Sequence, residues 1–229
     1  MKLAALFSGG KDSTYCIYLA KQSGHEVVCL ITMNPRSDES MLFHYPDTWI
    51  AKYLANAMEI PLLTKDAIGV SIDDESVELE LSIKEAMQIY NIEGIVHGGI
   101  SSMFQKRVFE KLCQNNGIAT FTPLWNNEPV EYMYELVKNQ FEFIITRVSA
   151  MGLNLCWLGK LIDMQSLGKL LSLSKKFGFN ISFEGGEAET LVVSCPLYHG
   201  KRLKIAKSSV SWDNLSGILQ ISEAGMGHV

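Results

Sequence analysis

Near its N-terminus the chain contains the segment Leu3-Ala4-Ala5-Leu6-Phe7-Ser8-Gly9-Gly10-Lys11-Asp12-Ser13, from which the fold class follows. Its first five residues form a short apolar run, typical of a buried strand, and residues 13–22 have the spacing of an amphipathic helix. Two adjacent glycines let the backbone approach a ligand closely, and the N-terminus of a helix carries partial positive charge. This order of strand, glycine turn and helix predicts an anion-binding loop.

The residue types in this loop suit the phosphates of a nucleotide. Lys11 would neutralise phosphate charge, and serine hydroxyls would donate hydrogen bonds to it. Asp12 would help to hold the magnesium that accompanies ATP. The spacing is not that of a Walker A loop, and the alternative is a plain capped turn with a surface lysine. We assign nucleotide binding to Ser8, Gly9, Gly10, Lys11 and Ser13, magnesium binding to Asp12, and catalytic roles to Lys11 and Asp12.

The first half of the chain alternates short apolar runs with helix-period segments, which is typical of parallel strands joined by crossover helices. The pattern predicts strands at residues 3–7, 27–33, 62–65, 94–97 and 119–121. Helices are expected at residues 13–22, 46–58, 76–90 and 101–115. We therefore expect a doubly wound, mainly parallel α/β sheet, with a ligand site outside the carboxyl ends of its strands.

The rhythm changes after residues 123–127. A helix is expected at residues 130–139, a strand at 141–148, a helix at 165–177, and strand-like sequence from residue 191 onward. We predict two domains: an ATP-binding domain at residues 1–126 and a smaller C-terminal α+β domain, which binds the substrate, at residues 127–229.

Composition excludes several classes of protein. The 229 residues are 47% hydrophobic and 20% charged, as in an ordinary globular protein. A net charge of -5 disfavours an extended nucleic-acid surface, and five cysteines without a close pair argue against a disulfide framework or a zinc site. The first apolar run is too short for a signal peptide or a membrane span, so we expect a cytoplasmic protein without membrane association.

A second glycine turn, Ile95-Val96-His97-Gly98-Gly99-Ile100-Ser101-Ser102, repeats the plan of the first. We expect it to reach the same crevice. Phe104, Val108 and Leu112 are expected to form the buried stripe of the following helix, with three basic residues (Lys106, Arg107 and Lys111) on its solvated face. Nucleotide contacts are assigned to Gly98, Gly99, Ser101, Ser102 and Gln105. A purely structural role stays open for Ser101, Gln105 and His97, and His97 is alternatively a neighbour of the ribose or base.

Three carboxylates lie within six residues near the end of the chain, Glu184, Glu187 and Glu189. Such close carboxylates repel one another unless a cation or a hydrogen-bond donor lies among them. We expect apolar strands on both sides of this segment and a bound cation within it. The alternative is an acidic, solvated hairpin tip.

Six segments in order carry a resemblance to a known family. They are Ser8 to Ser13, Phe43-His44, Gly98 to Ser102 with Gln105, Pro123-Leu124-Trp125, Trp157-Leu158-Gly159 with Ile162-Asp163, and Glu184 to Thr190. The first resembles the hallmark of the PP-loop ATP pyrophosphatases. All six together resemble the diphthine-ammonia ligases over nearly the whole chain, and the acidic segment is the specific part.

The resemblance implies a fold and a reaction. The N-terminal domain would have the PP-loop, adenine nucleotide alpha hydrolase-like fold. The enzyme would use ATP, Mg²⁺ and ammonium to amidate the carboxylate of diphthine, a modified histidine of translation elongation factor 2. An acyl-adenylate would form, and the products would be diphthamide, AMP and pyrophosphate.

The resemblance also implies further site residues. His44 would join the nucleotide-binding set, and Glu184, Glu187 and Glu189 would be catalytic by gathering and deprotonating ammonium. Aromatic side chains could hold the trimethylammonium group of diphthine by cation-π attraction, with Tyr198 as one candidate. Substrate contacts are assigned to Trp157, Phe183, Gly185, Gly186 and Thr190. Whether the glutamates hold ammonium, trimethylammonium or magnesium stays open.

Three alternatives remain beside this reading. A related PP-loop ligase would amidate another carboxylate. A tRNA-modifying PP-loop enzyme would be expected to have paired cysteines or a basic RNA-binding extension. A non-catalytic sensor would bind the nucleotide without turnover.

Overall fold

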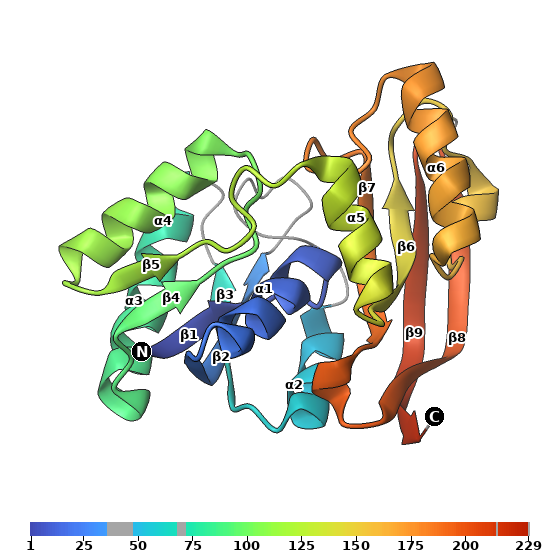
Figure 1. The fold of residues 1–229 in the computed structure, drawn as a ribbon. Coiled ribbons are helices and arrows are strands. Elements are labelled where there is room, and N and C mark those ends of the chain that lie inside the picture. The colour runs from blue at the N-terminus through green and yellow to red at the C-terminus, as the bar shows by residue number, and fades with distance from the viewer. Residues whose placement is uncertain (36–47, 68–71, 214, 229) are drawn as a thin grey trace. The chain divides into compact units, whose positions relative to one another are not determined.

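The chain is described by a computed structural model that covers residues 1–35, 48–67, 72–213 and 215–228. It divides into two compact units, Met1–Trp125 and Asn126–Val229. Each unit has its own sheet (Figure 1).

The first unit is built on a five-stranded sheet with the order β3-β2-β1-β4-β5, in which all neighbouring strands are parallel. The strands are β1 (Lys2–Leu6), β2 (Glu26–Pro35), β3 (Leu62–Ala67), β4 (Gly94–Val96) and β5 (Ala119–Phe121). The strand order reverses at β1, so the carboxyl ends of β1 and β4 flank the topological switch point of the sheet.

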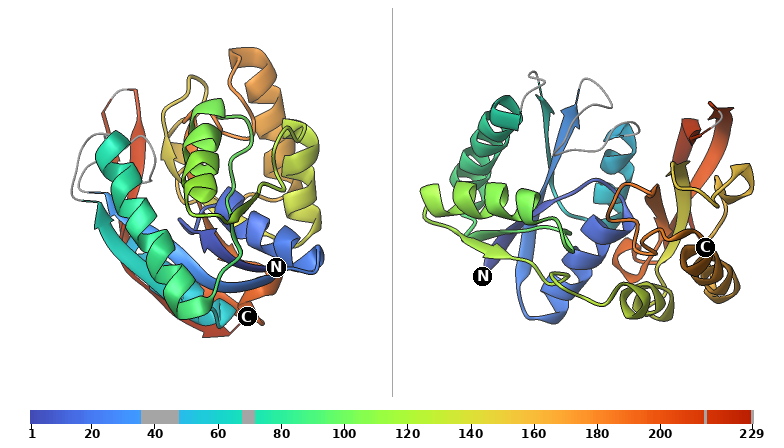
Figure 2. Two further views of the ribbon diagram at one scale, coloured as in Figure 1. Left: turned by 90° about the vertical axis from the view of Figure 1, so that its left-hand side faces the viewer. Right: turned by 90° about the horizontal axis from the view of Figure 1, so that it is seen from above.

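Helices cover both faces of this sheet. They are α1 (Lys11–Gln22), α2 (Ala51–Met58), α3 (Ile72–Tyr90) and α4 (Met103–Asn115), and a 3₁₀ turn, η1 (Thr48–Ile50), leads into α2. Figure 2 shows α3 and α4 on one face and α1 and α2 on the other. The predicted doubly wound, mainly parallel α/β fold is therefore confirmed.

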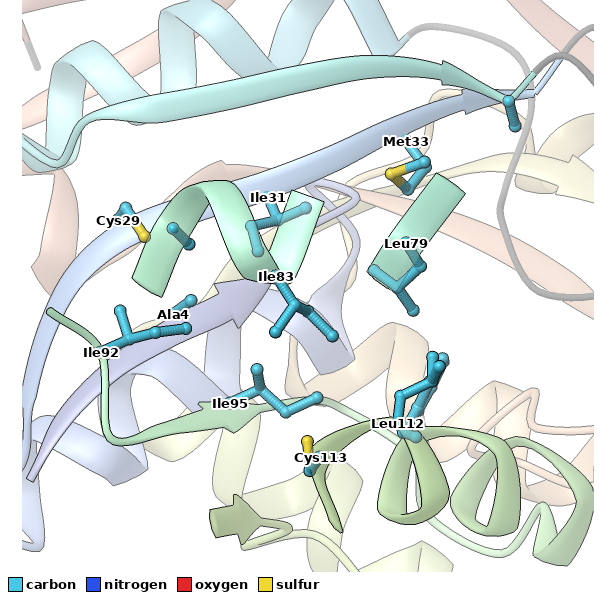
Figure 3. Close-up of a cluster of buried hydrophobic side chains, with 13 residues drawn as sticks. Ala4, Cys29, Ile31, Met33, Leu79, Ile83, Ile92, Ile95, Leu112 and Cys113 are labelled. Atoms are coloured by element: carbon cyan, nitrogen blue, oxygen red, sulfur yellow. The ribbon is translucent and has the colours of Figure 1, made fainter. Parts of the chain in front are cut away.

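The core under α3 and α4 is apolar. Figure 3 shows Ile31 from β2 and Ile95 from β4 pointing toward Leu79 and Ile83 of α3. Leu112 of α4 packs against the same cluster. Burying such side chains is worth about 1.5–3 kcal/mol each, so this cluster anchors both helices to the strand ends that carry the glycine turns.

The second unit is a four-stranded antiparallel sheet with the order β7-β6-β9-β8. Its elements are α5 (Pro129–Lys138), β6 (Glu142–Val148), η2 (Leu155–Trp157), α6 (Met164–Phe177), β7 (Ala188–Ser194), η3 (Pro196–Tyr198), β8 (Lys201–Trp212) and β9 (Gly217–His228). The helices α5 and α6 lie on the same face of the sheet (Figures 1 and 2). This is the smaller α+β unit that the sequence predicts.

Local sequence explains where the helices of this unit begin and end. The Asp163 side chain accepts the Ser166 N–H at 2.7 Å, and the Ser166 hydroxyl accepts the Asp163 N–H at 3.0 Å, which is a capping box. Ser166 also holds the pKa of Asp163 below its ordinary value through these hydrogen bonds. Gly178 ends α6 with a φ of 81°, a conformation that favours glycine.

Three expectations about secondary structure need correction. Residues 179–183 form turns and loop instead of a strand, so the glutamate segment joins α6 to β7 and has a strand on only one side. The helix expected at residues 46–58 is the turn η1 followed by α2, and residues 46 and 47 lie outside the described part of the chain. Helix α1 begins two residues earlier than expected, at Lys11, because the glycine turn itself supplies the start of the helix.

Two classes of feature can be set aside. None of the helices in the described ranges is long and apolar enough to cross a membrane. Four cysteines are buried and Cys156 is exposed, and none forms a disulfide. Burial raises the pKa of Cys29 and Cys195 to about 12, so these two thiols stay protonated at neutral pH.

Candidate nucleotide and carboxylate sites

The first glycine loop is closed by its own hydroxyl groups. The Ser8 N–H donates to Ser13 Oγ at 3.2 Å, and the two serine hydroxyls lie 3.0 Å apart. The Gly10 carbonyl accepts from Ser13 Oγ at 3.1 Å and from Thr14 Oγ1 at 2.8 Å. Gly9 has a φ of 81°, so a side chain at this position would be strained. The turn is therefore fixed from within, which preorganises its backbone for a ligand.

Lys11 and Asp12 form an ion pair in the first turn of α1. Lys11 Nζ lies 2.9 Å from both carboxylate oxygens of Asp12. The lysine side chain is 2% exposed and the aspartate 31%. A buried ammonium needs a negative partner, and Asp12 supplies one within the loop. The loop thus presents a cation whose charge is balanced by a carboxylate at its edge.

The second glycine turn lies directly against the first loop. Strands β1 and β4 are parallel neighbours, with Ala5 opposite Val96. A Cβ atom on Gly98 would lie 2.6 Å from the Asp12 carbonyl carbon and 2.8 Å from the Ser13 nitrogen. Only glycine allows this approach without a backbone shift. The expectation that both turns reach one edge of the sheet is therefore met by backbone contact.

His97 is buried between this turn and α4. Its side chain is 2% exposed, its Nδ1 accepts the Gly99 N–H at 3.2 Å, and its ring packs edge to face with Phe109, with centroids 4.8 Å apart. Burial, and secondarily the charge of Lys106, lowers the pKa of His97 to about 4. The imidazole is therefore neutral at physiological pH.

Ser102 is the N-cap of α4, and its hydroxyl accepts the Gln105 N–H at 3.4 Å. Ser101 is exposed and Gln105 is half-buried. The expected buried stripe is wrong at Phe104, which is 43% exposed. The buried residues of α4 are Phe109, Leu112 and Cys113, so the apolar face is turned relative to the predicted one.

The basic residues of α4 divide into two kinds. Arg107 and Lys111 are exposed, as expected. Lys106 is instead only 22% exposed, and its Nζ lies 4.0 Å from the ring centroid of Trp125 and 3.7 Å from Glu110. The cation-π contact ties α4 to the Pro123-Leu124-Trp125 segment. His44, a predicted nucleotide contact, lies outside the described residues.

Glu187 in the second unit is held by backbone amides. Its Oε1 accepts the Asn180 N–H at 3.0 Å, and its Oε2 accepts the Gly185 N–H at 2.8 Å. The Glu187 carbonyl also accepts the Ser149 N–H at 2.9 Å. Hydrogen bonds from backbone N–H groups to a carboxylate are charge-assisted and therefore hold it firmly in place. Glu187 therefore organises the loop that connects α6 to β7.

Glu189 lies on β7, opposite Arg147 of β6 in the antiparallel ladder. Arg147 Nη1 is 3.7 Å from Glu189 Oε1, and each side chain is half-buried. Glu184 is half-buried in the preceding turn. Among the described residues, no group of three or more His, Cys, Asp or Glu side chains is arranged to hold a metal ion. Donors therefore lie against two of the three carboxylates, and the bound cation stays a prediction.

The other acidic-segment residues shape the turn. The Gly186 N–H donates to the Phe183 carbonyl at 3.2 Å, and Gly186 has a φ of 79°. Gly185 lies so close to the Glu187 carboxylate that an added Cβ would be 2.8 Å from Oε1. Thr190 is half-buried on β7, opposite Ile145.

The three aromatic residues that were predicted as contacts of the substrate are buried. Tyr198 is fully buried, and its hydroxyl donates to the Val192 carbonyl at 3.4 Å. Phe183 is buried, has a φ of 63°, and stacks on Phe179. Trp157 is also buried, with Lys160 Nζ 4.7 Å from its ring centroid. These rings serve packing and leave little exposed face for a trimethylammonium group.

Sequence reasoning missed Arg147 and Thr14. Thr14 directly follows the Ser8 to Ser13 loop, so its hydroxyl could have been recognised from the sequence as part of the loop. The structure shows that Thr14 is buried. Arg147 carried none, because its role depends on the register between β6 and β7.

The first unit defines a class of protein. A parallel sheet of order β3-β2-β1-β4-β5, a Ser-Gly-Gly-Lys-Asp-Ser loop after β1 and a second glycine turn packed on that loop are the features of an α/β protein of the PP-loop type.

Within that class, the chain belongs to the diphthamide synthase family. The family model described as the diphthamide synthase N-terminal domain matches residues 1–120, and the one described as the C-terminal domain matches residues 128–226.

Three curated relatives that match the chain share the name diphthine–ammonia ligase. The diphthine–ammonia ligase of Bos taurus is 33% identical over 88% of this chain and 82% of its own length. The Homo sapiens protein of that name is 32% identical with the same coverage. The Schizosaccharomyces pombe ligase is 33% identical over 92% of this chain and 37% of its own length. A solved structure of a predicted tRNA methyltransferase subunit from Methanocaldococcus jannaschii is 18% identical over 86% of this chain and 98% of that one, with a TM-score of 0.45; a likeness of this size says nothing about function.

Proposed function

We propose that this chain is a diphthine–ammonia ligase, which uses ATP to convert the terminal carboxylate of diphthine on translation elongation factor 2 into an amide. The diphthine carboxylate attacks the α-phosphorus of ATP and releases pyrophosphate, which gives an acyl-adenylate. Ammonia then attacks the acyl carbon, loses a proton, and AMP departs. The observation that carries the proposal is the buried Lys11 in a glycine loop of a chain that belongs to the diphthamide synthase family.

The first loop suits the phosphate groups of ATP. Gly98 leaves no space for a side chain behind Asp12 and Ser13, so the turn of α1 has a rigid backing. Lys11 supplies the positive charge, and the hydroxyls of Ser8 and Ser13 supply donors. Donors fixed in advance stabilise charge that develops on the departing pyrophosphate. Asp12 is the carboxylate of this loop that would hold Mg²⁺, which neutralises phosphate charge when bound.

In the second unit, we assign the chemistry of ammonium to Glu184 and Glu189. Both side chains are half-buried; Glu184 lies within the loop that Glu187 organises, and Glu189 lies on β7 directly after it. A carboxylate attracts ammonium and can accept a proton from it. Glu187 belongs to the positioning of this segment, since its carboxylate already accepts two backbone N–H groups.

The proposed substrate implies a partner and a compartment. Diphthine-bearing elongation factor 2 is the protein substrate, ammonium is the nitrogen source, and the cytoplasm is where translation factors work. The net charge of -5 is consistent with a protein partner and gives no extended surface for nucleic acid.

The test is incubation of the full chain with diphthine-bearing elongation factor 2, ATP, Mg²⁺ and isotope-labelled ammonium. Peptide mass spectrometry should find the label in the modified histidine, and the nucleotide products should be AMP and pyrophosphate. ADP and phosphate would contradict the reaction class. AMP formation with an unlabelled factor would favour a related ligase that acts on another carboxylate, and ATP binding without turnover would favour a sensor.

A further inference from the structure

The imidazole of His97 has one ring nitrogen committed to the backbone. Nδ1 accepts the Gly99 N–H at 3.2 Å, across the second glycine turn. An imidazole nitrogen that accepts a hydrogen bond carries no proton, so the proton of the neutral ring lies on Nε2. The geometry therefore defines one tautomer.

Gly98 connects this hydrogen bond to the first loop. It lies between the two residues that form the bond, and its backbone is in contact with that of Asp12 and Ser13. Close-packed backbones transmit a shift because there is no empty space to absorb it. A change in the turn at residues 97–99 therefore moves the first turn of α1, where Lys11 lies.

The other ring nitrogen, Nε2, makes a histidine less favourable at this position than an apolar side chain of similar size. Nε2 is buried, and it has no hydrogen-bond partner within the described residues. The ring edge packs against Phe109 instead. An apolar side chain would fill this space without burying an unpartnered N–H group. The hydrogen bond that Nδ1 accepts from Gly99 therefore explains why a polar ring occupies this position.

We propose that His97 is a positioning residue for the phosphate-binding loop: by accepting the Gly99 N–H, it fixes the turn against which Asp12 and Ser13 are packed. His97 acts through Gly98 and need not touch the nucleotide. The choice of ATP as the ligand rests on the proposed function, whereas the hydrogen bond and its effect on the loop do not.

Two amide substitutions separate the two ring nitrogens. His97→Asn places an oxygen near the position of Nδ1 and keeps the acceptor for Gly99, whereas His97→Gln places its amide near Nε2. We expect the Asn variant to bind ATP within about threefold of the unmodified chain, and the Gln variant to bind on the order of tenfold more weakly, as measured by calorimetry. Equal affinities of the two variants, whether normal or reduced, would overturn the proposal.

Two further measurements need no ATP, and the first of them uses the unmodified chain. Long-range ¹H–¹⁵N NMR of the unmodified chain should find the His97 proton on Nε2, and a proton on Nδ1 would overturn the inference. Without nucleotide, amide exchange at Gly99 and Thr14 should accelerate in the Gln variant but not in the Asn variant. If the chain binds no ATP at all, the proposed function fails, while the tautomer and exchange results still decide the role of His97.

Discussion

Arg147 and Glu189 face each other across the β6–β7 ladder, with 3.7 Å between Nη1 and Oε1. At this distance the guanidinium offsets part of the negative charge of the Glu189 carboxylate. The Glu189 side chain is 24% exposed, so its carboxylate can approach a cationic substrate. This relationship distinguishes Glu189 from Glu187, whose carboxylate accepts one backbone N–H group on each oxygen.

Glu189→Gln should therefore lower amide formation severely and leave ATP affinity near normal. The substitution keeps the size of the side chain and removes the charge that attracts ammonium. Labelled amide on elongation factor 2 and the Kd of ATP are the two quantities to measure. Glu223→Gln is the matched control, since Glu223 pairs with Lys207 on the exposed β8–β9 hairpin and should keep full activity. Equal loss of ATP binding and amidation in Glu189→Gln would place Glu189 in the nucleotide site instead.

Glu187→Gln should act on stability. A glutamine has one acceptor oxygen, so one of the N–H groups of Asn180 and Gly185 loses its acceptor and faces the NH₂ group. We expect the free energy of unfolding to fall by about 1–3 kcal/mol. Urea denaturation followed by tryptophan fluorescence measures it, with Glu223→Gln expected to stay within about 0.5 kcal/mol. A Glu187→Gln variant as stable as the control would mean that these hydrogen bonds do not organise the loop.

Gly98→Ala should disturb the first loop. The new methyl group would fall 2.6 Å from backbone atoms of Asp12, and backbone cannot move aside as a flexible side chain can. We expect a loss of about 1–3 kcal/mol in stability together with weaker ATP binding. Gly168→Ala in α6 is the control, because nothing lies within 4 Å of its Cβ position and alanine favours a helix by about 0.5–1 kcal/mol over glycine. Normal ATP binding by Gly98→Ala would mean that the second glycine turn does not support ATP binding by the first loop.

His97 predicts a pH dependence of stability. Its pKa is about 4 in the folded chain and 6.5 in the unfolded reference. Between these values the unfolded state binds a proton that the folded state does not, so stability falls as the pH drops from 6.5 to 4. The full effect is on the order of 3 kcal/mol. His97→Asn lacks this titration, so the stability difference between the two chains should change by that amount over the interval; a constant difference would contradict the buried, neutral imidazole.

Lys11→Ala should reduce pyrophosphate release by at least about tenfold, because a charge-assisted contact to phosphate is worth about 1.5–3 kcal/mol. Asp12 is partly exposed, so its carboxylate can be hydrated once Lys11 is gone, and the fold should persist. The control is Lys84→Ala, which removes a comparable 2.9 Å pair with Glu80 on the exposed side of α3. Unchanged pyrophosphate release in Lys11→Ala would contradict the assignment of the first loop to the phosphates of ATP.

The sequence predicted features that depend on neighbouring residues. The first loop was readable because glycines, lysine and hydroxyls occur together between a strand and a helix, and its closing hydrogen bonds span no more than five residues. Gly98 was assigned to the right edge of the sheet because both turns follow parallel strands. Its backbone contact with Asp12 depends on the packing of those turns and has no sequence signal.

The remaining features depend on tertiary structure. Phe104, Val108 and Leu112 have helical spacing, but the contacts of α4 with the sheet select Phe109 and Cys113 together with Leu112. The three glutamates looked like mutually repelling charges, because neither the register that brings Arg147 to Glu189 nor the turn that aims two amides at Glu187 is visible in sequence. Such partners require the fold itself.

In the proposed reaction, ATP cleavage is coupled to amidation of diphthine. The most direct measurement is the ratio of AMP released to labelled amide formed on diphthine-bearing elongation factor 2 in one reaction. We expect a ratio near one, no labelled amide when ammonium is omitted, and neither product when the diphthine residue is omitted. AMP formed at the same rate without the factor, or no label in the modified histidine while ATP is consumed, would contradict this coupling.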